Sequence, residues 1–240
     1  MENKIDVIFE NENIIVVNKQ PYIYVYKEDE NIKKNTIIDY LKNSCAIKNV
    51  LPVTSLDFEA SGIVVFAKNK KSYDFIADQF KKETVKRTYH IIVNGVMENN
   101  EGEINKKLIV TQQTTSVNDK GIKSVTKYVV KEQFKSFAFV EVFPVTVRKN
   151  QIRAHFWAAG NSLAIDNIYS SGEPLLLSSL KKRYKGINKE KPLLKRLPLH
   201  LSEIEFVLPE TEERKVFTVD LAQDMKLTLK QLGKYNKRGS

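Results

Sequence analysis

Apolar residues along the chain occur in short runs or alternate with polar residues, and both patterns are typical of β-strands. These patterns predict strands near residues 5–9, 13–18, 62–67, 88–94, 123–130, 137–143, 202–208 and 215–219. Helices are predicted near residues 36–44, 71–82, 150–159 and 222–232. The second helix is the clearest, because Tyr73, Ile76 and Phe80 fall on one helix face. Strands dominate and helices intervene irregularly, which favours an α+β fold with a central mixed, mostly antiparallel sheet and flanking helices.

Composition indicates a folded protein with a polyanionic partner. Of the 240 residues, 42% are hydrophobic and 28% are charged, which is enough apolar material for a core. Lys and Arg outnumber Asp and Glu by 39 to 29, and a formal net charge of +10 favours nucleic acid as the partner. The alternative is a basic protein that is merely soluble.

The organisation of the chain predicts one domain over residues 1–240, ending in a basic tail from about residue 226 to residue 240. We find no internal repeat and no linker rich in Pro, Gly or Ser. The single cysteine, Cys45, excludes an internal disulfide and favours a reducing compartment. With no apolar signal segment and no apolar run of about 18 residues, we expect a cytoplasmic protein without a membrane partner.

One acidic residue stands just before the most apolar predicted strand. The segment Leu56-Asp57-Phe58-Glu59-Ala60-Ser61-Gly62 is followed at once by the apolar run 63–67. Apolar surroundings hold such a carboxylate rigidly, and partial desolvation makes its pKa sensitive to neighbouring charges. Most Asp residues in turns only initiate the turn. The segment therefore gains meaning only together with other motifs.

Six segments in order supply that context. Residues 56–62 resemble the Leu-Asp-x-x-Thr-Ser-Gly signature of the RluA-type RNA pseudouridine synthases. Five further segments are similar to that family, namely 7–19, 80–93, 121–128, 146–155 and 199–201. The first ends in Val-Asn-Lys, and the second contains Lys-Arg-Thr-Tyr. The segment 146–155 is close to Thr-Gly-Arg-Thr-His-Gln-Ile-Arg-x-His. The resemblance implies the pseudouridine synthase fold. Because it begins by residue 7, we expect no S4-like RNA-binding module.

The resemblance also implies the chemistry. Pseudouridylation breaks the C1′–N1 bond of a uridine, turns the base and rejoins it through C5, without a metal or another cofactor. The matching residues are Asp57, Arg153 and Tyr89. Asp57 is the nucleophile or the base that starts elimination at the sugar, and Arg153 keeps that carboxylate ionised. The Tyr89 ring stacks on the extruded base, and its phenol is a proton acceptor or orienter at C5. The three His residues are far apart in sequence, and no Cys or His pair has zinc-ligand spacing.

The implied partner is RNA, either tRNA or rRNA, bound by a monomer. A uridine inside a stack must be flipped out, and phosphate contacts from basic side chains offset part of that cost. We predict such contacts from Arg148 and Lys149, just before the predicted helix that carries Arg153, and from Gln151 at the start of that helix. The basic segment 181–196 is a second, weaker candidate.

The chain departs from the family pattern near the predicted site. Ser55 stands where the family has an Arg that fills the gap left by the flipped base, and Ala60 replaces a Thr. Val147, Asn150 and Ile165 replace Gly, His and Gly. Two interpretations follow, an active isomerase or a degenerate relative that binds RNA without turnover. The three retained residues favour the first interpretation, and the lost Arg favours the second.

Overall fold

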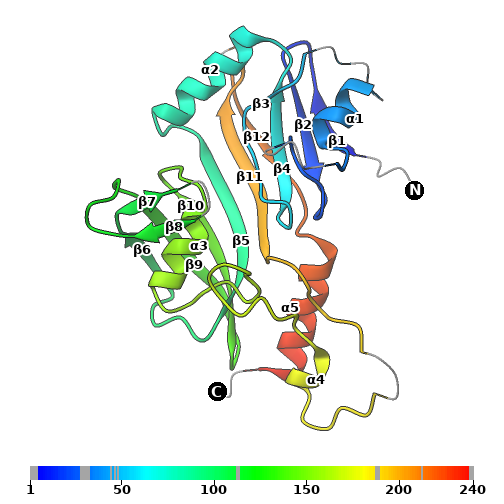
Figure 1. The fold of residues 1–240 in the computed structure, drawn as a ribbon, viewed down its shortest axis with the longest axis vertical. Coiled ribbons are helices and arrows are strands. Elements are labelled where there is room, and N and C mark those ends of the chain that lie inside the picture. The colour runs from blue at the N-terminus through cyan, green and yellow to red at the C-terminus, as the bar shows by residue number, and fades with distance from the viewer. Residues whose placement is uncertain are drawn as a thin grey trace. The chain divides into compact units, whose positions relative to one another are not determined.

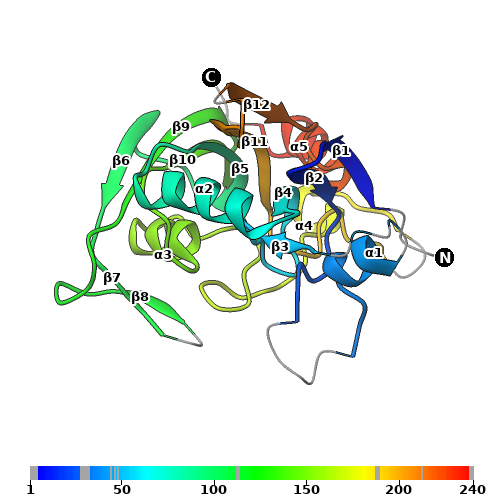
Figure 2. The same cartoon turned by 90° about the horizontal axis from the view of Figure 1, so that it is seen from above.

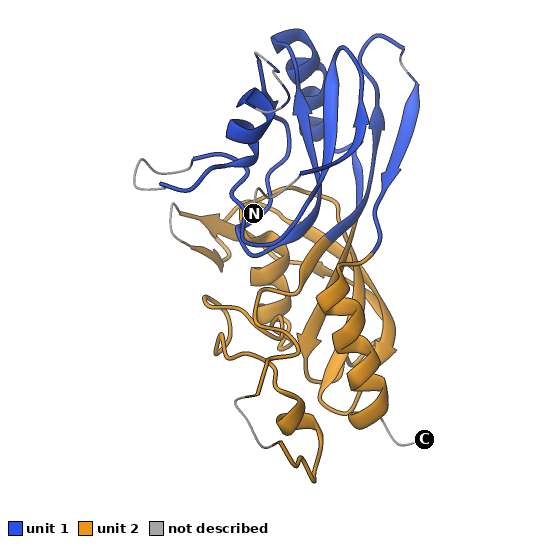
Figure 3. Cartoon of the chain, turned by 90° about the vertical axis from the view of Figure 1, so that its right-hand side faces the viewer, with its two compact units in different colours: residues 1–87, 201–220 blue, residues 88–200, 221–240 orange. Residues whose placement is uncertain are grey.

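The computed structural model describes residues 5–27, 33–43, 45, 47, 49–111, 114–186, 190–211 and 213–237. The chain divides into two compact units, residues 1–87 with 201–220 and residues 88–200 with 221–240, which Figure 3 colours separately. Strands β5 and β11 each contribute residues to both units. Figure 1 shows the helices and strands with their labels.

The first unit is a sheet with two helices. Its elements are β1 (Asp6–Glu10), β2 (Ile14–Lys19), α1 (Ile37–Asn43), β3 (Leu51–Pro52), β4 (Ser61–Ala67), α2 (Lys70–Lys81), most of β11 (Leu199–Val207) and β12 (Arg214–Thr218). The strand order is β1-β2-β4-β11, with β3 beside β4 and β12 beside β11. Every residue of β4 is buried, as its continuous apolar run predicts.

The backbone at the start of β4 requires a glycine at position 62, directly before this run. Its φ of +113° lies in a region that side chains avoid, and a Cβ atom there would lie 2.2 Å from the carbonyl oxygen of Leu201. Only glycine lets the start of β4 approach the backbone of β11 so closely. The loop that carries Asp57 therefore enters the sheet at a fixed point.

The second unit contains most of β5 (Lys86–Asn94), followed along the chain by β6 (Glu101–Asn105), β7 (Leu108–Val110), β8 (Thr115–Val117), β9 (Val125–Gln133), β10 (Phe137–Pro144), α3 (Gln151–Ala158), α4 (Leu177–Leu180) and α5 (Gln223–Tyr235). Its strand order is β5-β10-β9-β6, and each of these pairs is antiparallel. Strands β7 and β8 form a separate two-stranded ribbon that extends beyond β6 (Figure 2). Ile92, Phe134, Met225 and Leu232 belong to one buried cluster, which fixes α5 on this unit.

The predicted α+β class is confirmed, and each predicted strand and helix overlaps an observed element. The periodicity did not predict β3, β6, β7, β8 or α4. Residues 226–235 of the expected basic tail belong to α5, and residues 238–240 lie outside the described part of the chain. Leu232 is buried, and Asn236 accepts hydrogen bonds from the backbone of Lys135 and Ser136, so the end of this helix is anchored.

Among the described residues, none of the helices combines the length and the apolar content that crossing a bilayer requires.

Candidate active site

Asp57 lies in the loop between β3 and β4 of the first unit. Its side chain is half-buried between Leu56 and Ala60, which are 7% and 0% exposed. The loop closes a tight turn, because the Ala60 amide donates to the Asp57 carbonyl at 3.0 Å. These contacts leave Asp57 on a short, rigid connection immediately before a fully buried strand.

A buried lysine holds this loop through its backbone. Lys19, at the end of β2, is 1% exposed, and its Nζ donates to the carbonyl of Ala60 at 2.6 Å and to that of Phe58 at 3.2 Å. A third bond reaches the Gln20 carbonyl at 3.3 Å. A buried ammonium needs such acceptors, and the carbonyls gain strong charge-assisted bonds in return. The Val-Asn-Lys motif therefore supports the loop that carries Asp57.

Arg153 lies in the second unit, on α3, and is 8% exposed. It makes a bidentate ion pair with Asp166, with Nε–Oδ2 and Nη2–Oδ1 distances of 2.7 Å. Nη1 also donates to Asn150 Oδ1 at 3.1 Å. Sequence reasoning missed Asp166 as a partner, although it falls within a family motif. This pair fixes the plane of the guanidinium.

Asp166 is itself fixed by the backbone that follows it. Its Oδ1 accepts from the amides of Ile168 at 2.9 Å and Tyr169 at 3.1 Å. The Tyr169 ring lies 5.5 Å from the Arg153 guanidinium, and its hydroxyl donates to the Thr115 carbonyl at 2.6 Å. Burial raises the pKa of Tyr169, so its hydroxyl stays protonated and can donate this bond. The contacts connect Arg153 with strand β8.

Gln151 is buried, with 4% exposure, and its amide bonds within the protein. Its Oε1 accepts from Thr146 Oγ1 at 2.8 Å, while Nε2 donates at 3.0 Å to the Val125 carbonyl and to Thr126 Oγ1. Our predicted role for Gln151 therefore changes from an RNA contact to a support of the turn before α3. The sequence could not distinguish an RNA contact from a buried amide, because helical periodicity does not show which polar side chain faces inward.

The other predicted site residues also lie in the second unit. Tyr89 is half-buried in β5, opposite Val142 of β10. Arg148 is half-buried and Lys149 exposed, both directly before α3. The structure thus groups Arg148, Lys149 and Arg153 around the start of α3. Asp57 belongs to the first unit, so its pairing with Arg153 stays a prediction.

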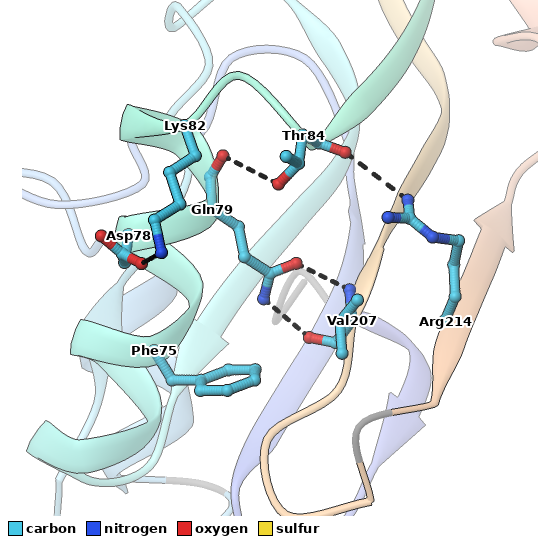
Figure 4. A pocket seen from close by; sticks show the side chains of 7 residues that line it. All are labelled: Phe75, Asp78, Gln79, Lys82, Thr84, Val207 and Arg214. Atoms are coloured by element: carbon cyan, nitrogen blue, oxygen red, sulfur yellow. Dashed lines mark hydrogen bonds and ion pairs between the residues drawn. The ribbon is translucent and has the colours of Figure 1, made fainter.

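A surface pocket in the first unit offers no competing site. It is lined by Phe75, Asp78, Gln79, Lys82, Thr84, Val207 and Arg214 (Figure 4). Gln79 bonds both backbone groups of Val207, and Asp78 pairs with Lys82. These polar groups are engaged within the protein, and we assign no ligand to the pocket. Within the described part of the chain, no group of three or more His, Cys, Asp or Glu residues could hold a metal ion.

Comparisons with known proteins identify the family of the chain. The model of the RNA pseudouridylate synthase family matches residues 13–158. The uncharacterized RNA pseudouridine synthase YjbO of Bacillus subtilis (strain 168) is 29% identical over 94% of this chain and 76% of its own length. The dual-specificity RNA pseudouridine synthase RluA of Vibrio cholerae is 28% identical over 86% of this chain and 79% of its own length.

The fold has solved counterparts. The structure of human RNA Pseudouridylate Synthase Domain Containing 4 covers 95% of this chain, and 93% of its own length is matched, with a TM-score of 0.71 and 19% identity. That likeness confirms the predicted pseudouridine synthase fold. Since the family model spans more than half of the sequence, the chain belongs to the RNA pseudouridylate synthase family, whose members are isomerases acting on RNA.

Proposed function

We propose that this chain isomerises uridine to pseudouridine in tRNA or rRNA, with Asp57 as the catalytic carboxylate. The observation that carries the proposal is the rigid Asp57 loop, whose backbone accepts the buried Lys19 ammonium at two carbonyls. Reactions at a sugar carbon need a carboxylate held in one place, because small displacements of a reacting group reduce rates steeply.

The steps follow from the residues. Asp57 attacks C1′ or removes a proton from the sugar, and the C1′–N1 bond breaks. After the base turns, C5 bonds to C1′ while the Asp57–C1′ bond breaks or, in the elimination route, Asp57 returns the proton to the sugar. Tyr89 accepts or orients the C5 proton, and N1 takes up a proton. The product is therefore an isomer of the substrate, and nothing is oxidised or reduced.

Arg153 is proposed to keep Asp57 ionised. Its bidentate pair with Asp166 orients the guanidinium, whose five N–H donors allow it to serve a second carboxylate at the same time. Arg148 and Lys149 are proposed to contact RNA phosphates, which would make binding depend on salt.

The class of RNA rests on relatives. One is named a ribosomal large subunit pseudouridine synthase D, from Zymomonas mobilis, and it is 26% identical over 95% of this chain and 73% of its own length. This name favours rRNA, while the dual specificity of the Vibrio cholerae relative keeps tRNA among the candidates. The single cysteine supports a cytoplasmic location, which we propose together with a monomeric state.

The test is pseudouridine mapping of RNA from cells with and without the gene. Sites lost on deletion should return with the wild-type chain and not with Asp57→Asn, whose activity should fall by at least about 10³-fold. Asp74→Asn, the same change at an exposed position of α2 in the same unit, should restore the sites. If deletion changes no site while the purified chain binds RNA, the inactive RNA-binding interpretation, motivated by Ser55, replaces this proposal.

A further inference from the structure

Three aromatic rings gather around Phe58, the residue that follows Asp57 in the first unit. Phe58, the next residue, stacks on Tyr24 with ring centroids 4.4 Å apart and an interplanar angle of 28°. Tyr22 meets Phe58 edge-on, with centroids 5.7 Å apart and an angle of 69°. We call Tyr22, Tyr24 and Phe58 the aromatic cluster. None of these residues has a role in the proposed chemistry.

The aromatic cluster is not a closed core. Phe58 and Tyr24 are half-buried, and Tyr22 is 37% exposed. A cation accompanies the rings, since the Lys34 Nζ lies 5.2 Å from the Phe58 centroid and the Lys34 side chain is exposed. Accessible aromatic faces next to a basic side chain are the combination that single-stranded nucleic acids bind, through base stacking and phosphate contact.

Tyr22 adds a second, independent observation. Its φ is +68°, in the left-handed region that large side chains seldom occupy, and its amide donates to the Phe58 carbonyl at 2.7 Å. Glycine would adopt this backbone without strain. A strained, partly exposed aromatic residue that contacts the loop of a proposed catalytic carboxylate points to function more than to folding.

We propose that the aromatic cluster is a stacking platform for an unpaired base that neighbours the target uridine, with Lys34 near the phosphate of that nucleotide. This inference rests on the proposed function and deepens it, because it predicts that the substrate uridine lies in a single-stranded or loop segment. A flanking base that leaves the stack for the platform would offset part of the cost of flipping the uridine. Such help matters in a chain with Ser55 where its family carries an Arg.

The occupant is argued to be RNA because of charge and position. The chain carries a net charge of +10, the neighbouring Lys33 and Lys34 are both exposed, and the cluster is adjacent in sequence to Asp57. Glu59 also belongs to this loop, so the platform is not uniformly basic. A single stacked base beside one phosphate fits that mixed charge better than a long phosphate-binding groove does.

The test separates binding from turnover by using Asp57→Asn protein throughout. The probe is a short oligouridylate that carries one 2-aminopurine, whose fluorescence is quenched when the base stacks on an aromatic ring. Adding Tyr22→Gly should raise the Kd about fivefold or more and reduce the quenching. It should leave thermal stability unchanged or raised, since glycine relieves the left-handed conformation.

Matched variants complete the design. Tyr22→Phe keeps the ring and should keep both affinity and quenching. Lys34→Met should reduce the slope of log Kd against log salt concentration by about 0.7, which corresponds to the loss of one phosphate contact with a single strand. Unchanged affinity and quenching in Tyr22→Gly would overturn the platform, whatever the activity of the wild type. Loss of binding in Tyr22→Gly together with an inactive wild-type chain would retain the platform and reject the proposed isomerase activity.

Discussion

The Asp57 loop and the Arg153 helix are supported in opposite ways. In the first, a buried lysine bonds the backbone carbonyls of Phe58 and Ala60, and the Asp57 carboxylate takes no part in those bonds. In the second, the guanidinium of Arg153 is itself a member of the support, paired with Asp166 through two nitrogen atoms. The two regions thus differ in the group that takes part in the support, which is the loop backbone in the first and the Arg153 side chain in the second.

The difference separates the roles of the two residues. A change at Asp57 should remove the proposed activity and preserve the structure of the loop, because Lys19 still bonds its backbone carbonyls. A change at Arg153 should also remove structure, because Asp166 would lose its partner inside the protein. Loss of activity in an Arg153 variant is therefore informative only when stability is measured beside it.

The largest effect should come from Asp166→Ala. The substitution leaves Arg153 buried without its carboxylate, which typically costs about 3–5 kcal/mol. Urea denaturation followed by circular dichroism would measure the free energy of unfolding. Combining Asp166→Ala with Arg153→Met should recover part of this loss, because the unpaired charge is then absent. A loss below about 1 kcal/mol for Asp166→Ala would show that the pair does not support α3.

A smaller loss is expected for Lys19→Met, which keeps an unbranched side chain and removes the ammonium. The carbonyls of Phe58 and Ala60 would lose charge-assisted bonds, at a cost of about 2–3 kcal/mol. The same denaturation experiment applies. Lys70→Met is the control, because its exposed pair with Asp74 contributes only about 0.5 kcal/mol or less. Equal effects in the two variants would contradict the support of the Asp57 loop by Lys19.

Much of the fold could be predicted because its central strands are strongly patterned. The continuous apolar runs in β2 and β4 leave few alternatives, and the helical spacing in α2 is equally clear. Strand β6 lacks such a signal, since Ile104 is the only buried residue in Glu-Gly-Glu-Ile-Asn. Strands β7 and β8 have three residues each, too few to show an alternation.

The site could be predicted only as far as motifs reach. They single out Asp57 and Arg153 as candidates, but the partners that support these residues depend on tertiary structure. Lys19 bonds a carbonyl 41 positions away, and Arg153 pairs with Asp166 across 13 positions. Gln151 shows the converse case, because its motif suggested RNA while packing places its amide in the interior. Residue type and order do not reveal which polar group folding will enclose.

The smallest effect concerns the pH dependence of stability and arises from a buried histidine of α3. His155 of α3 is 0% exposed, its Nδ1 lies 2.9 Å from Thr126 Oγ1, and its Nε2 lies 3.2 Å from the Lys106 carbonyl. Burial lowers the pKa of His155 below its ordinary value of about 6.5. The bond to the Lys106 carbonyl opposes this shift, and the Lys106 charge adds to it, so that the pKa stays lowered. The folded state therefore favours the neutral ring, whereas the unfolded state accepts a proton more readily.

The sign follows from this preference. The contribution of His155 is fully present above its unfolded pKa and is lost as the pH falls from there toward the lower folded pKa. Denaturation at a series of pH values from about pH 8 to about pH 5 should show a decline in the free energy of unfolding, and this decline should be shallower in His155→Gln. The difference between the two proteins should be smaller than the loss expected for Asp166→Ala or for Lys19→Met. If the free energy of unfolding changes equally with pH in wild type and His155→Gln, then His155 and its contacts with Thr126 and Lys106 do not carry the pH dependence.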